Sequence, residues 1–282
     1  MSSSVQFYLA IFIFLMTYAG IMSEKIHRTI CALAGGGAMI YLGLVTQEQA
    51  ITEFIDFNTL GLLTGMMILI SVVKQSGFFQ VLALWALKKS KGSPRELLIL
   101  LSIVTAVGAA LIDSVTAALL IAPMTISLCR MLRMSPVPIL ISEILMCNIG
   151  GTALMIGNPP NVMIGSATHL DFNDFLINLA PVVVITVIVI LIAVLLIFKN
   201  DFSGVRMSAK ELEKIDIMSG VEDKSIFSRS LMVLALTVLG FVVHSHFGLE
   251  SATLEDMATW AAVSPYSKIS IQKGTSIPFP HF

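Results

Sequence analysis

Residues 113–161 read DSVTAALLIAPMTISLCRMLRMSPVPILISEILMCNIGGTALMIGNPPN, and this stretch decides the fold. It is mostly apolar, yet it contains a bare aspartate, a Gly-Gly pair and an Asn-Pro-Pro-Asn sequence. Irregular polar backbone is tolerated at membrane depth only where it is buried in protein or lines a cavity. The stretch therefore predicts a polar helix connection and a broken helix that together hold a solute. The alternative is that Gly and Pro serve only helix packing and kinking, as is common in membrane helices.

The composition predicts an all-α, polytopic membrane protein. Of 282 residues, 56% are hydrophobic and 12% are charged, with a mean hydropathy of +0.90, whereas soluble domains are about 25% charged. We expect a multi-pass integral protein whose first partner is the lipid bilayer, in a membrane that the sequence does not identify. A net charge of −1 predicts no nucleic-acid partner. The three cysteines have unrelated spacings and predict neither a disulfide framework nor a metal site.

Apolar runs of about 20 residues, the length of a membrane span, recur along the chain. We expect complete spans at residues 5–22, 26–45, 58–73, 179–198 and 230–249. Residues 78–87 are too short to cross and predict an interfacial helix with Trp85 near the headgroups. The glycines at 35–37 are expected to allow close helix approach. Residues 1–250 would form the membrane domain, with a connector at 199–229, and residues 251–282 an unrelated, disordered tail.

Two shorter apolar runs, residues 97–112 and 115–129, lie on either side of Asp113. An arginine precedes the first run and two arginines follow the second. We expect a re-entrant hairpin that begins and ends on one side of the membrane; two tilted full spans are the alternative. With the hairpin, all but two of the 17 Lys and Arg residues fall on one side, and the opposite loops, 46–57 and 166–178, have none. The positive-inside rule then places the connector in the cytoplasm and the N-terminus outside.

Asp113 is the strongest single candidate for function. An ionisable residue inside the membrane costs about 3 kcal/mol on insertion scales and marks a functional site by default. It could coordinate Na⁺ or exchange a proton, and Ser114 and Thr116 add hydroxyl oxygens of the kind that hard cations prefer. The alternative, which is compatible with the first, is that Asp113 caps the following helix by accepting from the amide of Val115 or Thr116.

The helix predicted to begin at Pro138 should break at residues 157–161, because two prolines remove two backbone donors and disfavour helical geometry before them. A broken helix exposes carbonyls that suit a cation and amides that suit an anion, and such a break opposite a hairpin tip is typical of secondary transporters. We predict that the ion-binding residues are Asp113, Ser114, Thr116, Asn148, Gly150, Gly151 and Thr152, and that the substrate-binding residues are Gly157, Asn158, Pro159, Pro160 and Asn161.

Other polar residues point to no catalytic chemistry. Glu143 lies in the same helix as the break and is expected to pair with Arg130 or Arg133 rather than to relay protons. The chain has no P-loop, no serine-nucleophile motif and no H-E-x-x-H sequence. We therefore expect no enzyme activity and no cofactor, other than Na⁺ or H⁺ as a coupling ion.

Three segments resemble the ion transporter superfamily. They are FNTLGLLTGMMILISVVKQSGFF (57–79), LLSIVTAVGAALIDSVTAALLIAPMT (100–125) and ISEILMCNIGGTALMIGNPPNVMIG (141–165). They are similar to the branch of the melanosomal P protein, arsenite permeases and bacterial sodium/proton antiporters, with sodium-coupled citrate and dicarboxylate carriers more distant. The resemblance covers roughly residues 20–250, and the N-I-G-G and G-N-P-P-N sequences are its most specific parts.

The resemblance implies two inverted repeats, each with a re-entrant hairpin and a broken helix, that enclose ions and substrate near the membrane midplane. It places the first hairpin tip at residues 113–116 and the first unwound segment at 157–161. In this branch the tip is usually Asp-Asn and the loop Gly-Asp-Pro-Pro-Asn, whereas this chain has Ser114 and Asn158. A second hairpin and a second broken helix do not follow, so we expect the first repeat only.

The function implied by the resemblance is cation-coupled transport of an inorganic or carboxylate anion, with Na⁺ or H⁺ as the coupling ion. Sodium/proton exchange is one alternative. The other is a non-transporting half-copy that regulates a full-length relative. A homodimer is a possible assembly, because an isolated half would leave its polar loops facing lipid.

Overall fold

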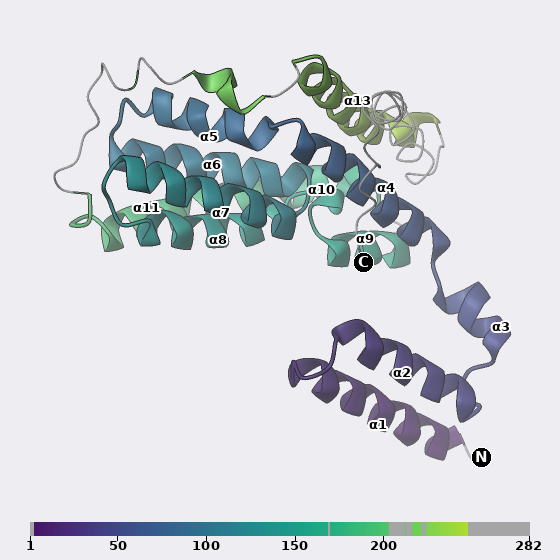
Figure 1. The fold of residues 1–282 in the computed structure, drawn as a ribbon. Coiled ribbons are helices and arrows are strands. Elements are labelled where there is room, and N and C mark those ends of the chain that lie inside the picture. The colour runs from purple at the N-terminus through teal and green to yellow at the C-terminus, as the bar shows by residue number, and fades with distance from the viewer. Residues whose placement is uncertain (1–2, 169, 203–211, 213–215, 222–223, 248–282) are drawn as a thin grey trace, which may run out of the picture. The chain divides into compact units, whose positions relative to one another are not determined.

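The computed structural model describes residues 3–168, 170–202, 212, 216–221 and 224–247 (Figure 1). The described residues form helices and connecting turns, without a β-strand. Among them, five helices are long and apolar enough to span a membrane: α1, α6, α7, α11 and α13. The all-α, polytopic fold that the sequence predicts is therefore confirmed. The predicted tail, residues 251–282, lies outside the described residues.

The chain divides into two units, Met1–Phe57 and Asn58–Phe282. The first unit contains α1 (Ser3–Met22), α2 (Arg28–Tyr41), the short α3 (Gln47–Gln49) and a π-helical turn at Ala50–Phe54. α2 has 14 residues and ends shortly before Gly43, whose φ of +68° is left-handed. The predicted span of residues 26–45 is therefore shorter than expected, because glycine readily adopts the left-handed conformation that ends a helix.

The three glycines of α2 differ in what surrounds them. A Cβ atom at Gly35 would lie 3.0 Å from Thr17 Cγ2 of α1, and closer still to the Thr17 hydroxyl oxygen. Gly36 and Gly37 have nothing within 4 Å of the position of a Cβ atom. Close helix approach is therefore confirmed at Gly35 alone, where α1 and α2 meet.

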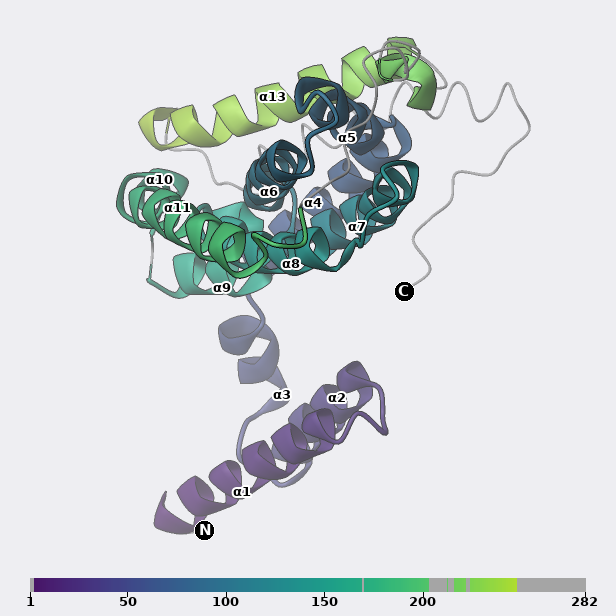
Figure 2. The same cartoon turned by 90° about the vertical axis from the view of Figure 1, so that its left-hand side faces the viewer.

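The second unit contains most of the helices. They are α4 (Phe57–Gln75), α5 (Phe78–Lys89), α6 (Pro94–Leu111), α7 (Ser114–Met131), α8 (Val137–Gly151), α9 (Pro159–Thr168), α10 (Phe172–Asn178), α11 (Ala180–Ile197) and α13 (Lys224–Phe247). Helices α6, α7 and α8 pack against one another, α5 packs on α6 and α7, and α11 packs on α8 (Figure 2). The buried face of α5 consists of Phe79, Ala83, Ala86 and Leu87, and its interfacial position stays a prediction.

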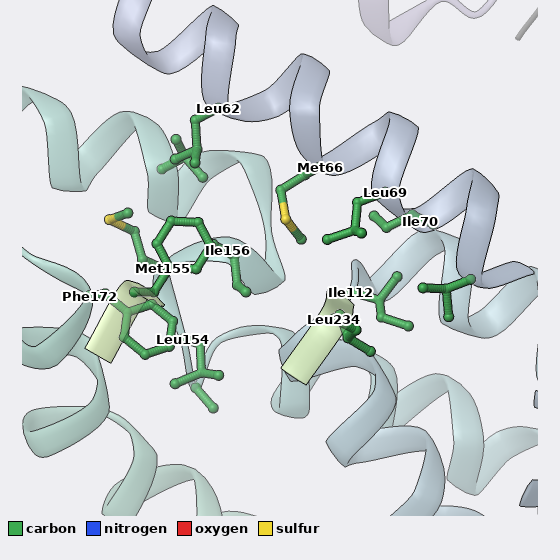
Figure 3. Packing of buried hydrophobic residues seen from close by; sticks show 14 of the residues in the cluster. Leu62, Met66, Leu69, Ile70, Ile112, Leu154, Met155, Ile156, Phe172 and Leu234 are labelled. Atoms are coloured by element: carbon green, nitrogen blue, oxygen red, sulfur yellow. The ribbon is translucent and has the colours of Figure 1, made fainter. Parts of the chain in front are cut away.

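An apolar cluster holds several helices and the connections between them together (Figure 3). Its labelled members are Leu62, Met66, Leu69 and Ile70 of α4, Ile112 between α6 and α7, Leu154, Met155 and Ile156 between α8 and α9, Phe172 of α10 and Leu234 of α13. Phe172 also stacks on Phe241 of α13, with ring centroids 5.6 Å apart. Burial of apolar side chains is the main stabilising term in folding. The cluster therefore fixes the connections on which the polar residues lie.

The two connections expected as loops without Lys or Arg, residues 46–57 and 166–178, contain short helices. In the first, Thr46 and Gln49 form a capping box at the start of α3. In the second, Asp171 and Asp174 form a capping box at the start of α10. A capping box satisfies the free backbone amides at the start of a helix. The polar side chains of these two connections therefore stabilise the first turns of α3 and α10.

Candidate functional site

The connection between α6 and α7 consists of Ile112 and Asp113. Asp113 is the N-cap of α7: its Oδ2 accepts a hydrogen bond from the Thr116 amide at 2.9 Å. The predicted capping role is therefore confirmed. Each helix has 18 residues, or about 27 Å at 1.5 Å per residue, and is longer than its predicted apolar run. The re-entrant placement and its alternative of two tilted spans both stay predictions.

The helix break lies upstream of the prolines. α8 ends at Gly151, a 3₁₀ turn covers Met155–Gly157, and α9 begins at Pro159. The unwound segment is therefore residues 152–158, and the prediction of 157–161 is wrong at both ends. The physical reason is that proline is tolerated in the first turn of a helix, where its missing N–H would have no intrahelical partner. The chain resumes a helix after the break as α9.

The start of α7 and the break between α8 and α9 meet through Ser114 and Asn158. Ser114 Oγ donates a hydrogen bond to Asn158 Oδ1. The Asn158 amide also lies against Gly151, where an added Cβ atom would be 2.8 Å from Asn158 Nδ2. The two positions at which this chain departs from the branch pattern thus contact each other. Both side chains are neutral, so Asp113 supplies the one formal charge in residues 112–118 and 150–162.

Asn161 has a structural task in the unwound segment. Its side chain is 7% exposed, and its Nδ2 lies 2.9 Å from the Leu154 carbonyl, 3.3 Å from that of Gly151 and 3.4 Å from that of Thr152. These carbonyls lie where the helical hydrogen-bond pattern is interrupted, so they need donors from elsewhere. The Asn161 side chain therefore holds the two ends of the unwound segment together, and we call these contacts the clamp. Its amide nitrogen is hydrogen-bonded within the chain.

The predicted anion site at residues 157–161 needs free backbone N–H groups, and few are free there. Gly157 N donates to the Leu154 carbonyl at 3.2 Å, and Asn161 N donates to the Asn158 carbonyl at 3.0 Å. Pro159 and Pro160 have no N–H group. Four of the five residues therefore do not offer an amide to an anion. The substrate-binding role of this segment stays a prediction, with Asn158 as its best-placed side chain.

Three of the other predicted ligands lie apart from this contact. Asn148 and Thr152 are exposed, Asn148 Nδ2 donates to the Ile144 carbonyl, and Thr152 Oγ1 donates to the Asn148 carbonyl. Gly150 faces α6, where an added Cβ atom would lie 2.7 Å from Ala106 Cα. The structure therefore brings together Asp113, Ser114, Thr116, Gly151 and Asn158, and assigns Gly150 to helix packing.

Glu143 does not pair with an arginine. Its side chain is 2% exposed and accepts a hydrogen bond from Thr125 Oγ1, whereas Arg130 and Arg133 are exposed. The predicted ion pair is therefore wrong, because the carboxyl group points into the packed helices and the guanidinium groups stay at the surface. Thr125 was missed by the sequence analysis, since nothing in one sequence indicates which hydroxyl faces a carboxyl group 18 residues away.

Replacing Asn161 with aspartate should destabilise the protein by about 1–3 kcal/mol, the cost of buried polar groups left unsatisfied. Aspartate has the same shape but puts an oxygen where Nδ2 donates to the carbonyls. The measurement is thermal unfolding of the purified protein in detergent. Asn148→Asp, the same chemical change on the exposed face of α8, is the control and should have a smaller effect. Equal effects of the two variants would contradict the clamp.

The chain is similar to a known protein family and to several known proteins. Residues 18–269 match the family described as citrate transporter. The chain is 36% identical over 239 residues to a 46 kDa membrane protein of Mycobacterium leprae, covering 84% of this chain and 56% of that protein. It is 37% identical over 243 residues to an uncharacterized transporter of Mycobacterium tuberculosis, covering 83% of this chain and 55% of the relative. It is also 41% identical over 167 residues to the human P protein, covering 56% of this chain and 20% of that protein.

The chain thus spans about half the length of the first two relatives. The resemblance to the ion transporter superfamily is confirmed, and so is the placement of the protein in a membrane as a multi-pass integral protein. Because the family match extends over most of the sequence, this chain belongs to the citrate transporter family.

Proposed function

We propose that this chain takes part in secondary active transport, in which Na⁺ or H⁺ binds at Asp113 and an inorganic or carboxylate anion moves with it. The observation that carries the proposal is the hydrogen bond between Ser114 and Asn158. It joins the start of α7, which Asp113 caps, to the start of α9, at the break. Binding at one side can therefore alter the position of the other.

The polar groups favour a cation at this place. The helix cap engages Asp113 Oδ2, and the second carboxylate oxygen can bind a cation. Hydroxyl and carboxamide oxygens, which hard cations accept as ligands, are present on Ser114, Thr116 and Asn158. The partial positive charge at the start of α9 favours an anion beside it, even though the two prolines offer no amide.

Reconstitution of the full 282-residue chain into proteoliposomes tests the proposal. Uptake of radiolabelled citrate, a carboxylate, and of radiolabelled phosphate, an inorganic anion, is measured with an inward Na⁺ gradient, with an inward proton gradient and with neither, beside protein-free vesicles. An enclosed pH dye reports proton movement. We expect one gradient to drive uptake of one of these anions above the level without a gradient. A dye response to Na⁺ that needs neither anion would replace the proposal with sodium/proton exchange, and no response in any arm would overturn it.

The contact between Ser114 and Asn158 should appear as a coupling energy. We expect Ser114→Ala and Asn158→Ala each to destabilise the protein, and the double variant to lose less than the sum by about 1 kcal/mol, the net contribution of one hydrogen bond. The measurement is thermal unfolding of the four proteins in detergent. Strictly additive effects would mean that the two side chains act independently.

A further inference from the structure

Glu143 is a buried carboxyl group with one oxygen unused. It lies in α8, its side chain is 2% exposed, and its Oε1 accepts a hydrogen bond of 2.5 Å from Thr125 Oγ1 of α7. Its Oε2 is buried and has no hydrogen-bond partner in the part of the chain that the structure describes. A buried polar atom without a partner is costly, so this oxygen is a candidate to bind a small ligand.

Hydroxyl groups are buried on the helices that pack here. Ser102 of α6 and Ser142, the residue before Glu143, share a hydrogen bond of 2.6 Å and are fully buried. Thr105 lies three residues after Ser102, on the same face of α6, and is fully buried too. Its hydroxyl oxygen has no partner among the described residues. The interior of the α6–α7–α8 bundle thus contains polar groups that are only partly satisfied.

No cationic side chain is available to Glu143 from the elements packed on α8, as far as the structure describes them. The titratable groups within electrostatic reach are the thiols of Cys129 on α7 and Cys147 on α8. α7 carries Asp113 at its N-cap and Arg130, which is exposed, in its last turn. α6 carries formal charge only in its first turn, at Arg95 and Glu96. α11 and the 3₁₀ turn at Met155–Gly157 contain no titratable residue. The carboxyl group therefore lacks the ion-pair partner that would stabilise a negative charge.

A proton is the ligand that this environment favours. Removing a carboxylate from water without a paired cation costs several kcal/mol, and one hydroxyl donor offsets only part of that cost. A hard metal cation needs about six oxygen ligands, whereas the described neighbours of Glu143 supply one hydrogen-bonding hydroxyl. A single proton on Oε2 removes the charge and requires no additional ligand.

We propose that Glu143 is a proton-binding site of this chain, separate from the cation site at Asp113. Its Oε2 takes a proton from water to form an O–H bond and returns it to water, so no other reactant is required. Proton binding itself does not depend on transport. Its use as a coupling step rests on the proposed function, and the experiment below separates the two.

Infrared spectroscopy of the purified full chain in lipid tests the proposal directly. The C=O stretch of a protonated carboxyl group is recorded as a function of pH in H₂O and D₂O, without a transport assay. We expect a band from a buried protonated carboxyl that disappears as the pH is raised. The band should be missing in Glu143→Gln and present in Asp113→Asn. An unchanged band in Glu143→Gln would overturn the proposal, and so would loss of the wild-type band when Na⁺ is added at constant pH.

Glu143→Gln keeps the size of the neutral acid and an oxygen that accepts from Thr125, so the variant should fold. In thermal unfolding, the wild type should lose stability as the pH is raised, since its buried acid must give up a proton. The glutamine variant should lack this part of the pH dependence. Parallel pH profiles for the two proteins would contradict proton binding at Glu143. If the band behaves as expected and the vesicles show no flux, the proposed function fails while the proton site stands.

Discussion

Replacing Asp113 with asparagine is expected to abolish cation-coupled uptake while the folded protein stays in the membrane. Asparagine retains a side-chain oxygen that accepts from the Thr116 amide, so the cap of α7 is preserved. It removes the formal charge that the cation requires. We expect citrate uptake in proteoliposomes to fall about 100-fold, the factor that corresponds to roughly 2.8 kcal/mol of lost binding. Unchanged flux would refute the role of Asp113.

Two further variants separate the charge of Asp113 from its cap. Asp113→Ser removes the charge and supplies another good capping side chain, so it should resemble asparagine in both stability and flux. Asp113→Ala removes the charge and the cap, and should cost about 1 kcal/mol of stability in addition. Thermal unfolding and the inserted fraction are measured beside uptake. If only the alanine variant lost flux, the cap and not the charge would be what transport needs.

Replacing Gly150 with alanine is expected to be the most destabilising single-methyl change in the second unit. Its Cβ atom would lie 2.7 Å from Ala106 Cα and 2.8 Å from the Ala106 carbonyl carbon, both backbone atoms that cannot rotate away. Helices α6 and α8 would have to separate, with loss of the buried bond between Ser102 and Ser142. We expect the free energy of unfolding to fall by about 3 kcal/mol, at the upper end of the range for overpacked cores. The measurement is the melting temperature of the purified protein in detergent, which should be lower.

Gly36→Ala is the matched control for this substitution. It makes the same change within a helix, at a position with nothing within 4 Å of the new atom. Because alanine has a better helix propensity than glycine by about 1 kcal/mol, this variant should be neutral or stabilised. If Gly150→Ala melted at the same temperature as Gly36→Ala, the close approach of α6 and α8 would be contradicted.

The sequence predicted the helices well because long apolar runs leave a membrane chain few other choices. The cap at Asp113 was also predictable, since aspartate before an apolar run is a common helix start. The break was misplaced because two prolines suggest an interruption, although they can equally occupy the first turn of the following helix. The capping boxes at Thr46 and Asp171 were visible in the sequence, as capping residues three positions before Gln49 and Asp174, and were missed.

The contacts that build the site could not be predicted. Ser114 and Asn158 are 44 residues apart, and the chain contains many serines and asparagines of equal propensity. Their pairing depends on how α6, α7 and α8 pack, which the periodicity of each helix does not specify. Burial was equally hidden at Glu143, where the arginines nearby in sequence suggested a surface ion pair. Helix propensity is a property of each segment by itself. Which polar side chains contact each other is decided by how the helices pack.

Three hydrogen bonds between side chains connect α6, α7, α8 and the break. They join residues 102 with 142, 114 with 158, and 125 with 143, so each of these six residues lies between Pro94 and Thr168. None of these three bonds needs a residue after Thr168, and chains fold from the N-terminus during synthesis. The polar centre can therefore assemble before the codons of α13 have been translated. A nascent chain arrested once α9 has left the ribosomal tunnel should already protect Cys147 from a thiol reagent.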